Sequence, residues 1–134
     1  MPKIVPEFFE ILPIENTAHV PSGYTTYPII QHEGEFIMGF REEGSVAGNH
    51  YHKGNSYSKN PQVILLSTGK IRLDLENLKT GEKQTFEIQA PKWIKVYPYV
   101  WHVITGLTDF SFLEFNSATE NGRDTHYDRE QFIQ

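Results

Sequence analysis

Apolar and polar residues alternate along most of the chain, and glycine or proline interrupts the alternation every several residues. In Lys70–Leu75 the alternation is strict, with Ile71, Leu73 and Leu75 on one face of the expected strand. The same pattern predicts further strands at 35–40, 62–66, 84–88, 93–97 and 110–115. No stretch keeps a helical period for more than about two turns. We therefore expect an all-β domain, either a β-barrel or a double-sheet jelly roll.

The two ends of the chain differ from this central part. Residues 35–116 hold the clear strands. Residues 1–34 are broken into what we expect to be short edge strands and loops by Pro6, Pro13, Pro21 and Pro28. Residues 117–134 form the C-terminal tail, and its polar segment 124–134 predicts either a short helix or a frayed end. Because no linker or internal repeat divides the sequence, we expect a single domain over residues 1–134.

Composition narrows the range of partners. A chain of 134 residues and 15.5 kDa is long enough to form a hydrophobic core without disulfides. Its formal net charge of −5 argues against nucleic acid, because phosphate backbones are bound by basic surfaces. The absence of cysteine excludes disulfides and thiolate metal sites. Without a signal segment or an apolar run of the ~18 residues that a membrane span needs, we expect a cytoplasmic protein with no membrane partner.

Three of the six histidines occur in two short segments, His50-Tyr51-His52 and Pro98–His102. On a strand, His50 and His52 would point to the same side, since side chains alternate with period two. Imidazoles held together can bind a divalent metal or exchange protons near neutral pH. They can also simply be hydrogen-bonded in a polar interior, and the spacing alone leaves these alternatives open.

The first segment resembles the first motif of the cupin superfamily, Gly-x5-His-x-His-x3–4-Glu-x6-Gly. Gly44, His50, His52 and Gly69 stand at the family positions for glycine and histidine. Gln62 takes the place of the glutamate, after nine residues rather than three or four. The resemblance implies a cupin-type β-barrel with an internal pocket.

The second segment is similar to the second cupin motif, which supplies one more histidine. His102 occupies that position, while Tyr97, Tyr99 and Gly106 replace the proline, glycine and asparagine of the family. Together the two motifs extend over roughly residues 35–116, most of the chain.

In the cupin family these positions ligate one metal ion. The resemblance therefore implies a site of His50, His52, Gln62 and His102, which could hold a divalent Fe, Ni, Mn or Zn ion. Glutamine offers a neutral oxygen where the family has a carboxylate, so the ion would meet no negative ligand. Metal binding and metal-free catalysis by the three histidines both stay open, and no organic cofactor is implied.

A second resemblance is to small cupins that isomerise nucleotide-linked keto-sugars. It rests on His50, His52 and Lys53, on Pro98–Trp101, and on a tail with Tyr127, Asp128 and Phe132. Those enzymes move a carbonyl between neighbouring sugar carbons, with paired histidines as acid and base and without a metal. The chain is also similar to capsular-polysaccharide enzymes with a C-terminal metal cupin, through its Gly-x-His-x-His segment. Both resemblances imply a carbohydrate or nucleotide-sugar ligand.

Four further residues could belong to such a site. Arg41 follows a strand end and could meet a phosphate or carboxylate of the ligand. Tyr99 and Trp101 flank the histidine of the second segment and could stack on a sugar ring or base, or belong to the core. Glu114 is expected to face solvent, the alternative being that it orients His102.

Residues 54–61 lengthen the connection that follows His52 relative to the keto-sugar isomerases. Their small, polar and turn-rich composition predicts a mobile loop at the barrel mouth. Such a loop could act as a lid or could be a tolerated surface insertion.

The sequence supports three functions. The first is an isomerase or epimerase acting on a carbohydrate or nucleotide-sugar, with His50, His52 and His102 as acid/base groups. The second is a metal-dependent enzyme such as an oxygenase with a three-histidine site. The third is a non-catalytic sugar-binding module, which the glutamine at position 62 favours. We also expect a homodimer, because the apolar N-terminal segment needs a partner surface.

Overall fold

The structure, a computed structural model, describes residues 8–128. Over this range strands predominate, as the alternating pattern predicts. The strands are β1 Phe9–Leu12, β2 Thr17–Val20, β3 Gly23–Thr26, β4 Ile37–Arg41, β5 Val46–His50, β6 Gln62–Thr68, β7 Lys70–Asn77, β8 Lys83–Gln89, β9 Lys92–Val96, β10 Val100–Gly106 and β11 Phe110–Glu114. A short helix, α1, covers Ala118–Arg123.

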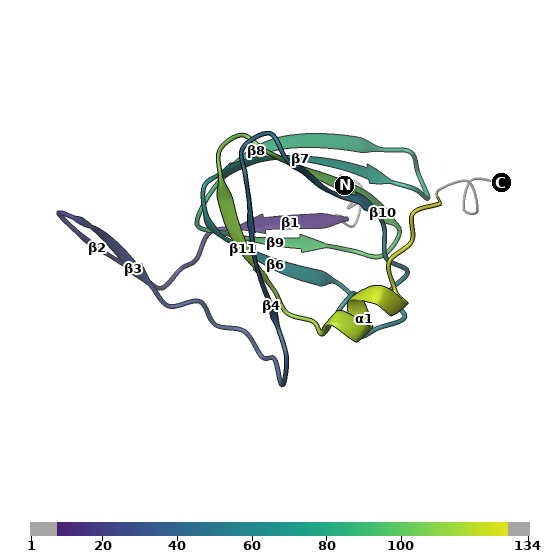
Figure 1. The fold of residues 1–134 in the computed structure, drawn as a ribbon, viewed down its shortest axis with the longest axis horizontal. Helices are drawn as coiled ribbons and strands as arrows, with labels where there is room; N and C mark the ends of the chain where they lie inside the picture. The colour runs from purple at the N-terminus through teal and green to yellow at the C-terminus, as the bar shows by residue number, and fades with distance from the viewer. Residues whose placement is uncertain (1–7, 129–134) are drawn as a thin grey trace, which may run out of the picture.

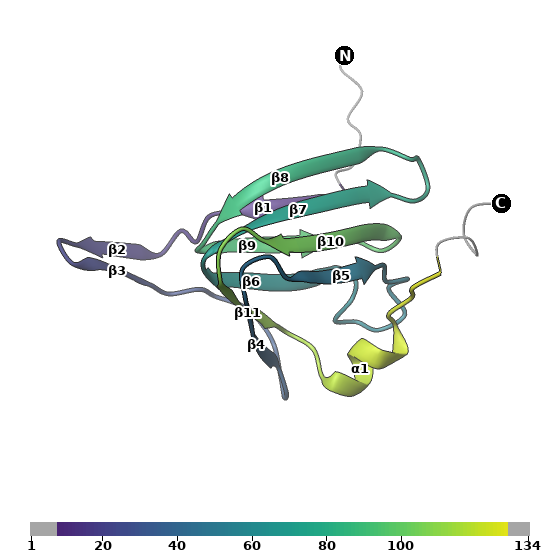
Figure 2. The same cartoon turned by 45° about the horizontal axis from the view of Figure 1, so that its top comes forward.

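Nine of these strands form two antiparallel sheets that enclose the core (Figure 1). One sheet has the order β1-β9-β6-β11-β4, and the other has the order β5-β10-β7-β8. The remaining strands, β2 and β3, pair with each other as a hairpin that projects away from the barrel (Figures 1 and 2). The helix α1 lies toward the opposite end of the barrel from this hairpin.

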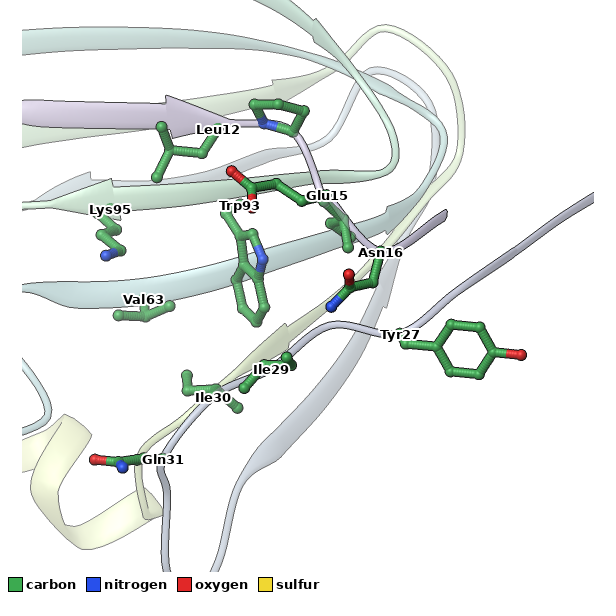
Figure 3. Close-up of a pocket in the computed structure, with 12 residues that line it drawn as sticks. Leu12, Glu15, Asn16, Tyr27, Ile29, Ile30, Gln31, Val63, Trp93 and Lys95 are labelled. Carbon is green, nitrogen blue, oxygen red and sulfur yellow. The ribbon is translucent and has the colours of Figure 1, made fainter. Parts of the chain in front are cut away.

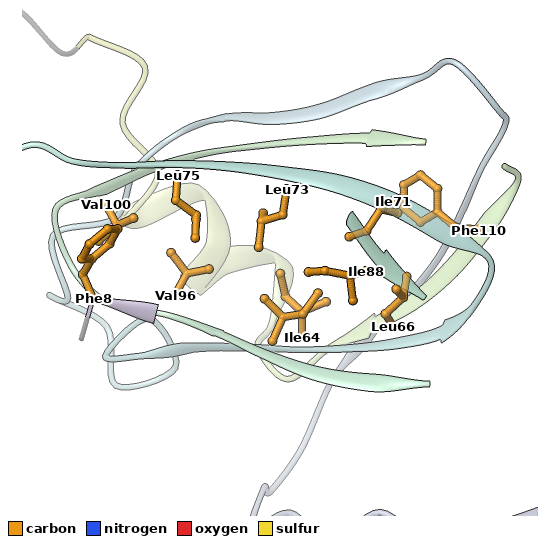
Figure 4. Close-up of a cluster of buried hydrophobic side chains, with 11 residues drawn as sticks. Phe8, Ile64, Leu66, Ile71, Leu73, Leu75, Ile88, Val96, Val100 and Phe110 are labelled. Atoms are coloured by element: carbon orange, nitrogen blue, oxygen red, sulfur yellow. The ribbon is translucent and has the colours of Figure 1, made fainter. Parts of the chain in front are cut away.

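The core fills the space between the two sheets, and Figure 4 shows its side chains pointing inward. On β7, Ile71, Leu73 and Leu75 are buried, with Leu73 0% exposed, which confirms the predicted face. The opposite face carries Arg72 and Asp74, which form an ion pair at 3.1 Å. Each buried aliphatic side chain contributes about 1.5–3 kcal/mol to folding. Burial of the apolar face of β7 therefore stabilises the packing of this strand against the core.

The secondary structure at the two ends of the described chain agrees only partly with what the sequence predicts. The proline-rich N-terminal region forms the short strands β1, β2 and β3, as expected. Of residues 124–134, which were expected to form a short helix or a frayed end, 124–128 are described and are not helical. Helix α1 ends just before them, at Arg123. Ser117 caps it, since the serine Oγ accepts a hydrogen bond from the Glu120 N–H at 3.1 Å. Phe132 of the keto-sugar isomerase resemblance lies outside the described residues.

Between β3 and β4 the chain crosses the outer face of the five-stranded sheet. It leaves a cavity of about 500 Å³ beneath it, with Trp93 of β9 on one side and Ile29 and Ile30 on the other (Figure 3). Within residues 8–128, α1 is far too short to cross a bilayer, and no other helix there has the required length and apolar character.

Candidate active site

His50 and His102 face each other across two paired strands. His102 of β10 pairs with His50, the last residue of β5, and the register shifts immediately beside this pair. The extra residue on β5 is Asn49, with a φ of 59°, and it follows Gly48, with a φ of 80°. A Cβ on Gly48 would lie 2.8 Å from the His102 carbonyl oxygen, so the close approach requires glycine. This β-bulge sets the direction of His50.

His52 lies just beyond β5 and is held at both ring nitrogens. Its Nδ1 is 2.6 Å from the Asp124 carbonyl oxygen, and its Nε2 is 2.9 Å from Oε1 of Gln62. A carbonyl only accepts, so the Nδ1–H donates to Asp124. A neutral ring has no second N–H, and the Gln62 amide must then turn so that its NH2 group donates to Nε2.

The three histidine rings form one cluster. Their centroids are 4.8 Å apart for His50 and His52, 4.6 Å for His50 and His102, and 5.1 Å for His52 and His102. The Nδ1–H of His102 donates to the Val100 carbonyl oxygen at 3.1 Å. The buried Nδ1 of His50 makes no such bond within the described residues. The structure thus brings together the three histidines that the sequence singles out, with Gln62 among them.

Burial keeps this cluster uncharged. Desolvation is the main cause that lowers the pKa of His50 to about 4 and that of His52 to about 3, and the positive charge of Lys59 lowers both further. Burial is also the main cause that lowers the pKa of His102, and the neighbouring His50 and His52 lower it further. The rings are therefore neutral near pH 7.

The histidines adjoin a pocket of about 160 Å³ inside the barrel. Most of its wall is apolar, and its charged or polar lining residues are Arg41, His50, Gln62, His102, Glu114 and Asn121. His52 is set back from this wall, and Gln62 covers it. The pocket is about large enough for one sugar ring and far too small for a whole nucleotide-sugar.

Arg41 and Glu114 both line the pocket, from neighbouring strands β4 and β11. The guanidinium of Arg41 lies 5.3 Å from the centre of the Phe112 ring, and Arg41 is exposed. Glu114 was expected to face solvent; it instead lies at the pocket wall, with Oε2 3.9 Å from Nζ of Lys59. The expectation fails because Glu114 pairs with a buried cation from a distant loop, which strand alternation does not reveal.

The two aromatic residues beside His102 lie on the other side of the sheet. Trp101 packs with Tyr51 and Leu78 in a separate buried cluster, and Tyr99 packs against it. Neither Tyr99 nor Trp101 lines the histidine pocket. Their placement does not support the expected stacking on a ligand there, because Trp101 adjoins His102 on one strand and so faces the opposite way.

The histidine cluster fits a metal ion in some respects. One ring nitrogen from each histidine lies within 4.8 Å of the others. In His102 the Val100 carbonyl holds Nδ1, which leaves Nε2 for a ligand, as is common at metal sites. In His52 both ring nitrogens are already bonded, to Asp124 and to Gln62. Against this, the cluster contains no carboxylate, and the nearby Lys59 ammonium would repel a cation.

Several site residues are not apparent from the sequence. The loop 54–61 is not an open flap, because its Lys59 is fully buried and bonded to Asn116 and Asn121. Asp124 accepts hydrogen bonds from the Lys53 and Ser56 backbone N–H groups. Burial raises the pKa of the Asp124 carboxyl, and these bonds outweigh it, so the pKa lies below its usual value. The only sequence signal was a lysine within a polar insertion.

Searches against known proteins add to this geometry. No family model matches the chain, and no match was found among curated proteins. Solved structures, in contrast, match over most of its length. QdtA, a sugar 3,4-ketoisomerase from Thermoanaerobacterium thermosaccharolyticum in complex with TDP, superposes with a TM-score of 0.69 and 14% identity, over 94% of this chain and 92% of that one.

Two other solved structures are also similar to this chain in fold. WlaRA, a TDP-fucose-3,4-ketoisomerase from Campylobacter jejuni, has a TM-score of 0.63 at 14% identity, with 92% of each chain covered. The dTDP-4-dehydrorhamnose 3,5-epimerase from Sulfolobus tokodaii has a TM-score of 0.59 at 16% identity, over 84% of this chain and 72% of that one. These likenesses confirm the expected fold: the chain is a cupin-type jelly roll.

Proposed function

We propose that this chain is an enzyme of the isomerase or epimerase type that acts on a nucleotide-linked keto-sugar. The observation that carries the proposal is the buried cluster of neutral imidazoles, two of which, His50 and His102, line a pocket the size of one sugar ring. The similarity in fold to QdtA and to the epimerase supports the choice of substrate class.

The cluster suits the transfer of a proton between neighbouring carbons. One neutral imidazole takes the proton from the carbon next to the ligand carbonyl, and a second gives a proton to the carbonyl oxygen, which forms an enediol. Proton return to the former carbonyl carbon, with loss of the neighbouring hydroxyl proton, moves the carbonyl by one carbon. We assign these steps to His50 and His102, with His52 beside them. Arg41, exposed at the pocket wall, would hold a phosphate of the nucleotide.

The test is incubation of the purified protein with TDP-4-keto-6-deoxyglucose in D2O, followed by NMR of the sugar protons. We expect deuterium at a carbon next to the carbonyl and a new keto-sugar, and neither in a His50→Gln variant. Binding without deuterium exchange would instead support the sugar-binding module. Absence of both binding and exchange would rule out this substrate class.

A metal-dependent enzyme is the second candidate, favoured by the Nε2 of His102, which the Nδ1–H bond to Val100 leaves open, and by the 4.8 Å spread of the three histidine nitrogens. His50, His52, Gln62 and His102 would hold the ion, and a bound divalent ion would polarise a carbonyl oxygen. Elemental analysis of protein purified without added metal separates the two candidates. Stoichiometric Fe, Ni, Mn or Zn that is lost in a His102→Ala variant would favour the metal-dependent enzyme.

We also propose a homodimer, in which a second copy covers the apolar surface that one chain leaves open. Strand β4 is an edge of its sheet, and Phe36, Met38 and Phe40 are exposed along it, Met38 by 75%. Exposed apolar edge strands otherwise promote aggregation. The projecting β2–β3 hairpin adds Val20 and Tyr24 to the exposed apolar surface. Light scattering coupled to size-exclusion chromatography should give twice the chain mass, and half that mass for Met38→Lys; a monomeric parent protein would contradict the proposal.

A further inference from the structure

Lys59 is a buried charged residue that the proposed proton transfer does not use. It is 0% exposed although it lies in the loop between β5 and β6. Its backbone N–H donates to the Ser56 carbonyl oxygen at 3.0 Å, and it forms a β-bridge with Gln62. The loop therefore delivers this side chain into the interior in a fixed position.

The ammonium of Lys59 lies among three side-chain oxygens. Its Nζ donates to Oδ1 of Asn121 at 2.8 Å and to Oδ1 of Asn116 at 3.2 Å, and it lies 3.9 Å from Oε2 of Glu114. Burying an ammonium is costly unless such partners compensate it. Desolvation lowers the pKa of Lys59, while the charges of Glu114, Asp124 and Glu120 oppose this change.

Two of these three partners also line the histidine pocket, namely Glu114 and Asn121. An ammonium has donors only, so the oxygen of each amide must face Lys59. For Asn121 this leaves the NH2 group as the part of the amide that is free for a ligand. Glu114, whose Oε2 forms an ion pair with the ammonium at 3.9 Å, has only acceptor oxygens to offer to a ligand. The polar wall of the pocket thus has a defined donor and a defined acceptor.

We propose that Lys59 is a positioning residue for substrate recognition: it orients Asn121 and Glu114 so that the pocket offers an amide N–H donor beside a carboxylate acceptor. This pair is complementary to a carbonyl oxygen next to a hydroxyl group, since the carbonyl accepts from Asn121 and the hydroxyl donates to Glu114. The ligand class is an α-hydroxy ketone, such as a keto-sugar. The catalytic consequence rests on the proposed isomerase function, but the orientation of Asn121 does not.

The first measurement uses the protein without ligand. In NMR spectra, the Asn121 side-chain NH2 protons should show nuclear Overhauser contacts to pocket-lining His50 or Phe112. In Lys59→Met, which keeps the length of the side chain and removes the donors, these contacts should weaken or disappear. Amide protons that point away from the pocket in the parent protein would overturn the proposal, whether or not the protein turns over any sugar.

The second measurement is the deuterium exchange of TDP-4-keto-6-deoxyglucose at varied concentration. We expect Lys59→Met and Asn121→Asp each to raise KM about tenfold, the loss of one hydrogen bond, with a smaller change in kcat. Asn121→Asp is informative because a carboxylate still accepts from Lys59 but cannot donate to the ligand. The double variant should be no worse than either single variant, since both remove the same donor.

Lys95→Met is the matched control, because Lys95 pairs with Glu10 on the outer face of the barrel. It should leave KM and the Asn121 contacts unchanged. If Lys59 only held the loop in place, Lys59→Met would lower the melting temperature and leave KM unaltered, and the proposal would fail. Should Lys59→Met not fold, an unchanged KM in Asn121→Asp would overturn it equally well. A parent protein without turnover defeats the proposed function, and the NMR measurement still decides the role of Lys59.

Discussion

The histidine pocket and the outer aromatic cluster are made from the same two segments of chain, yet they have opposite characters. His50, His52 and His102 gather inside the barrel, with ring centroids 4.6–5.1 Å apart. Tyr51 and Trp101 alternate with these histidines along the chain and pack together outside, with ring centroids 6.1 Å apart. One side of the sheet carries the imidazoles to which we assign the proposed proton transfer, and the other side is packed with aromatic side chains.

This difference shows how the fold divides stability from chemistry. Tyr51 and Trp101 are buried, and the Trp101 indole N–H also donates to Oδ1 of Asn49 in the bulge that directs His50. Aromatic pairs contribute about 0.5–1.5 kcal/mol beyond their burial. The outer cluster therefore holds β5 and β10 in register, so that the inner face can carry polar groups that contribute little to folding.

The largest expected effect is on catalysis, and it should be confined to the inner side. A His102→Gln variant should lose deuterium exchange by a factor on the order of 10³, the usual contribution of general acid–base catalysis. Leu78→Met keeps the volume of a buried side chain in the outer cluster and should change the rate less than about threefold, since a volume-conserving swap preserves the packing. Rates of exchange into the keto-sugar, measured by NMR on folded protein, provide the comparison. Equal losses of exchange rate in both variants would contradict the separation of catalysis on the inner side from stability on the outer side.

Much of this division could be predicted from the sequence. Period-two alternation predicted the strands and the face of β7, and it placed His50 and His52 together. Applied to the second segment, it would also have placed Trp101 opposite His102, because adjacent residues of a strand face opposite ways. The family resemblance instead directed attention to proximity along the chain, and proximity is not orientation.

The rest of the site could not be predicted from periodicity. Lys59 comes from a loop, Asn121 from α1 and Asp124 from the residue after the helix. Alternation carries information within one strand and none about how a loop docks on a helix that lies more than 50 residues later. The cues available, a polar insertion and a polar tail, indicated only local structure.

The next effect concerns the outer cluster and folding stability. Trp101→Ala should lower the free energy of unfolding by about 3 kcal/mol, because it removes a large buried ring and leaves a cavity. Urea unfolding followed by tyrosine fluorescence or circular dichroism measures the change. Tyr57→Ala, at a side chain that is 92% exposed, is the control and should cost much less than 1 kcal/mol. A loss below about 1 kcal/mol for Trp101→Ala would show that the cluster does not brace the sheet.

The smallest expected effect is the change in the free energy of unfolding with pH that results from the buried histidines. The pKa of His52 is about 3 in the folded protein and near 6.5 when unfolded. Between these values the unfolded chain binds the extra proton, so stability is full above pH 6.5 and falls as the pH drops toward 3. From pH 7 to pH 5 this histidine alone should cost about 2 kcal/mol.

Urea unfolding at pH 7 and pH 5 isolates that contribution when the parent is compared with His52→Gln. The difference between the two pH values should shrink by about 2 kcal/mol in the variant, because glutamine does not titrate. His19→Gln, at an exposed site on the β2–β3 hairpin, is the matched control and should retain the parent difference. A parent protein equally stable at both pH values would mean that the folded chain accepts protons on these rings, and the neutral cluster required for proton abstraction would then be wrong.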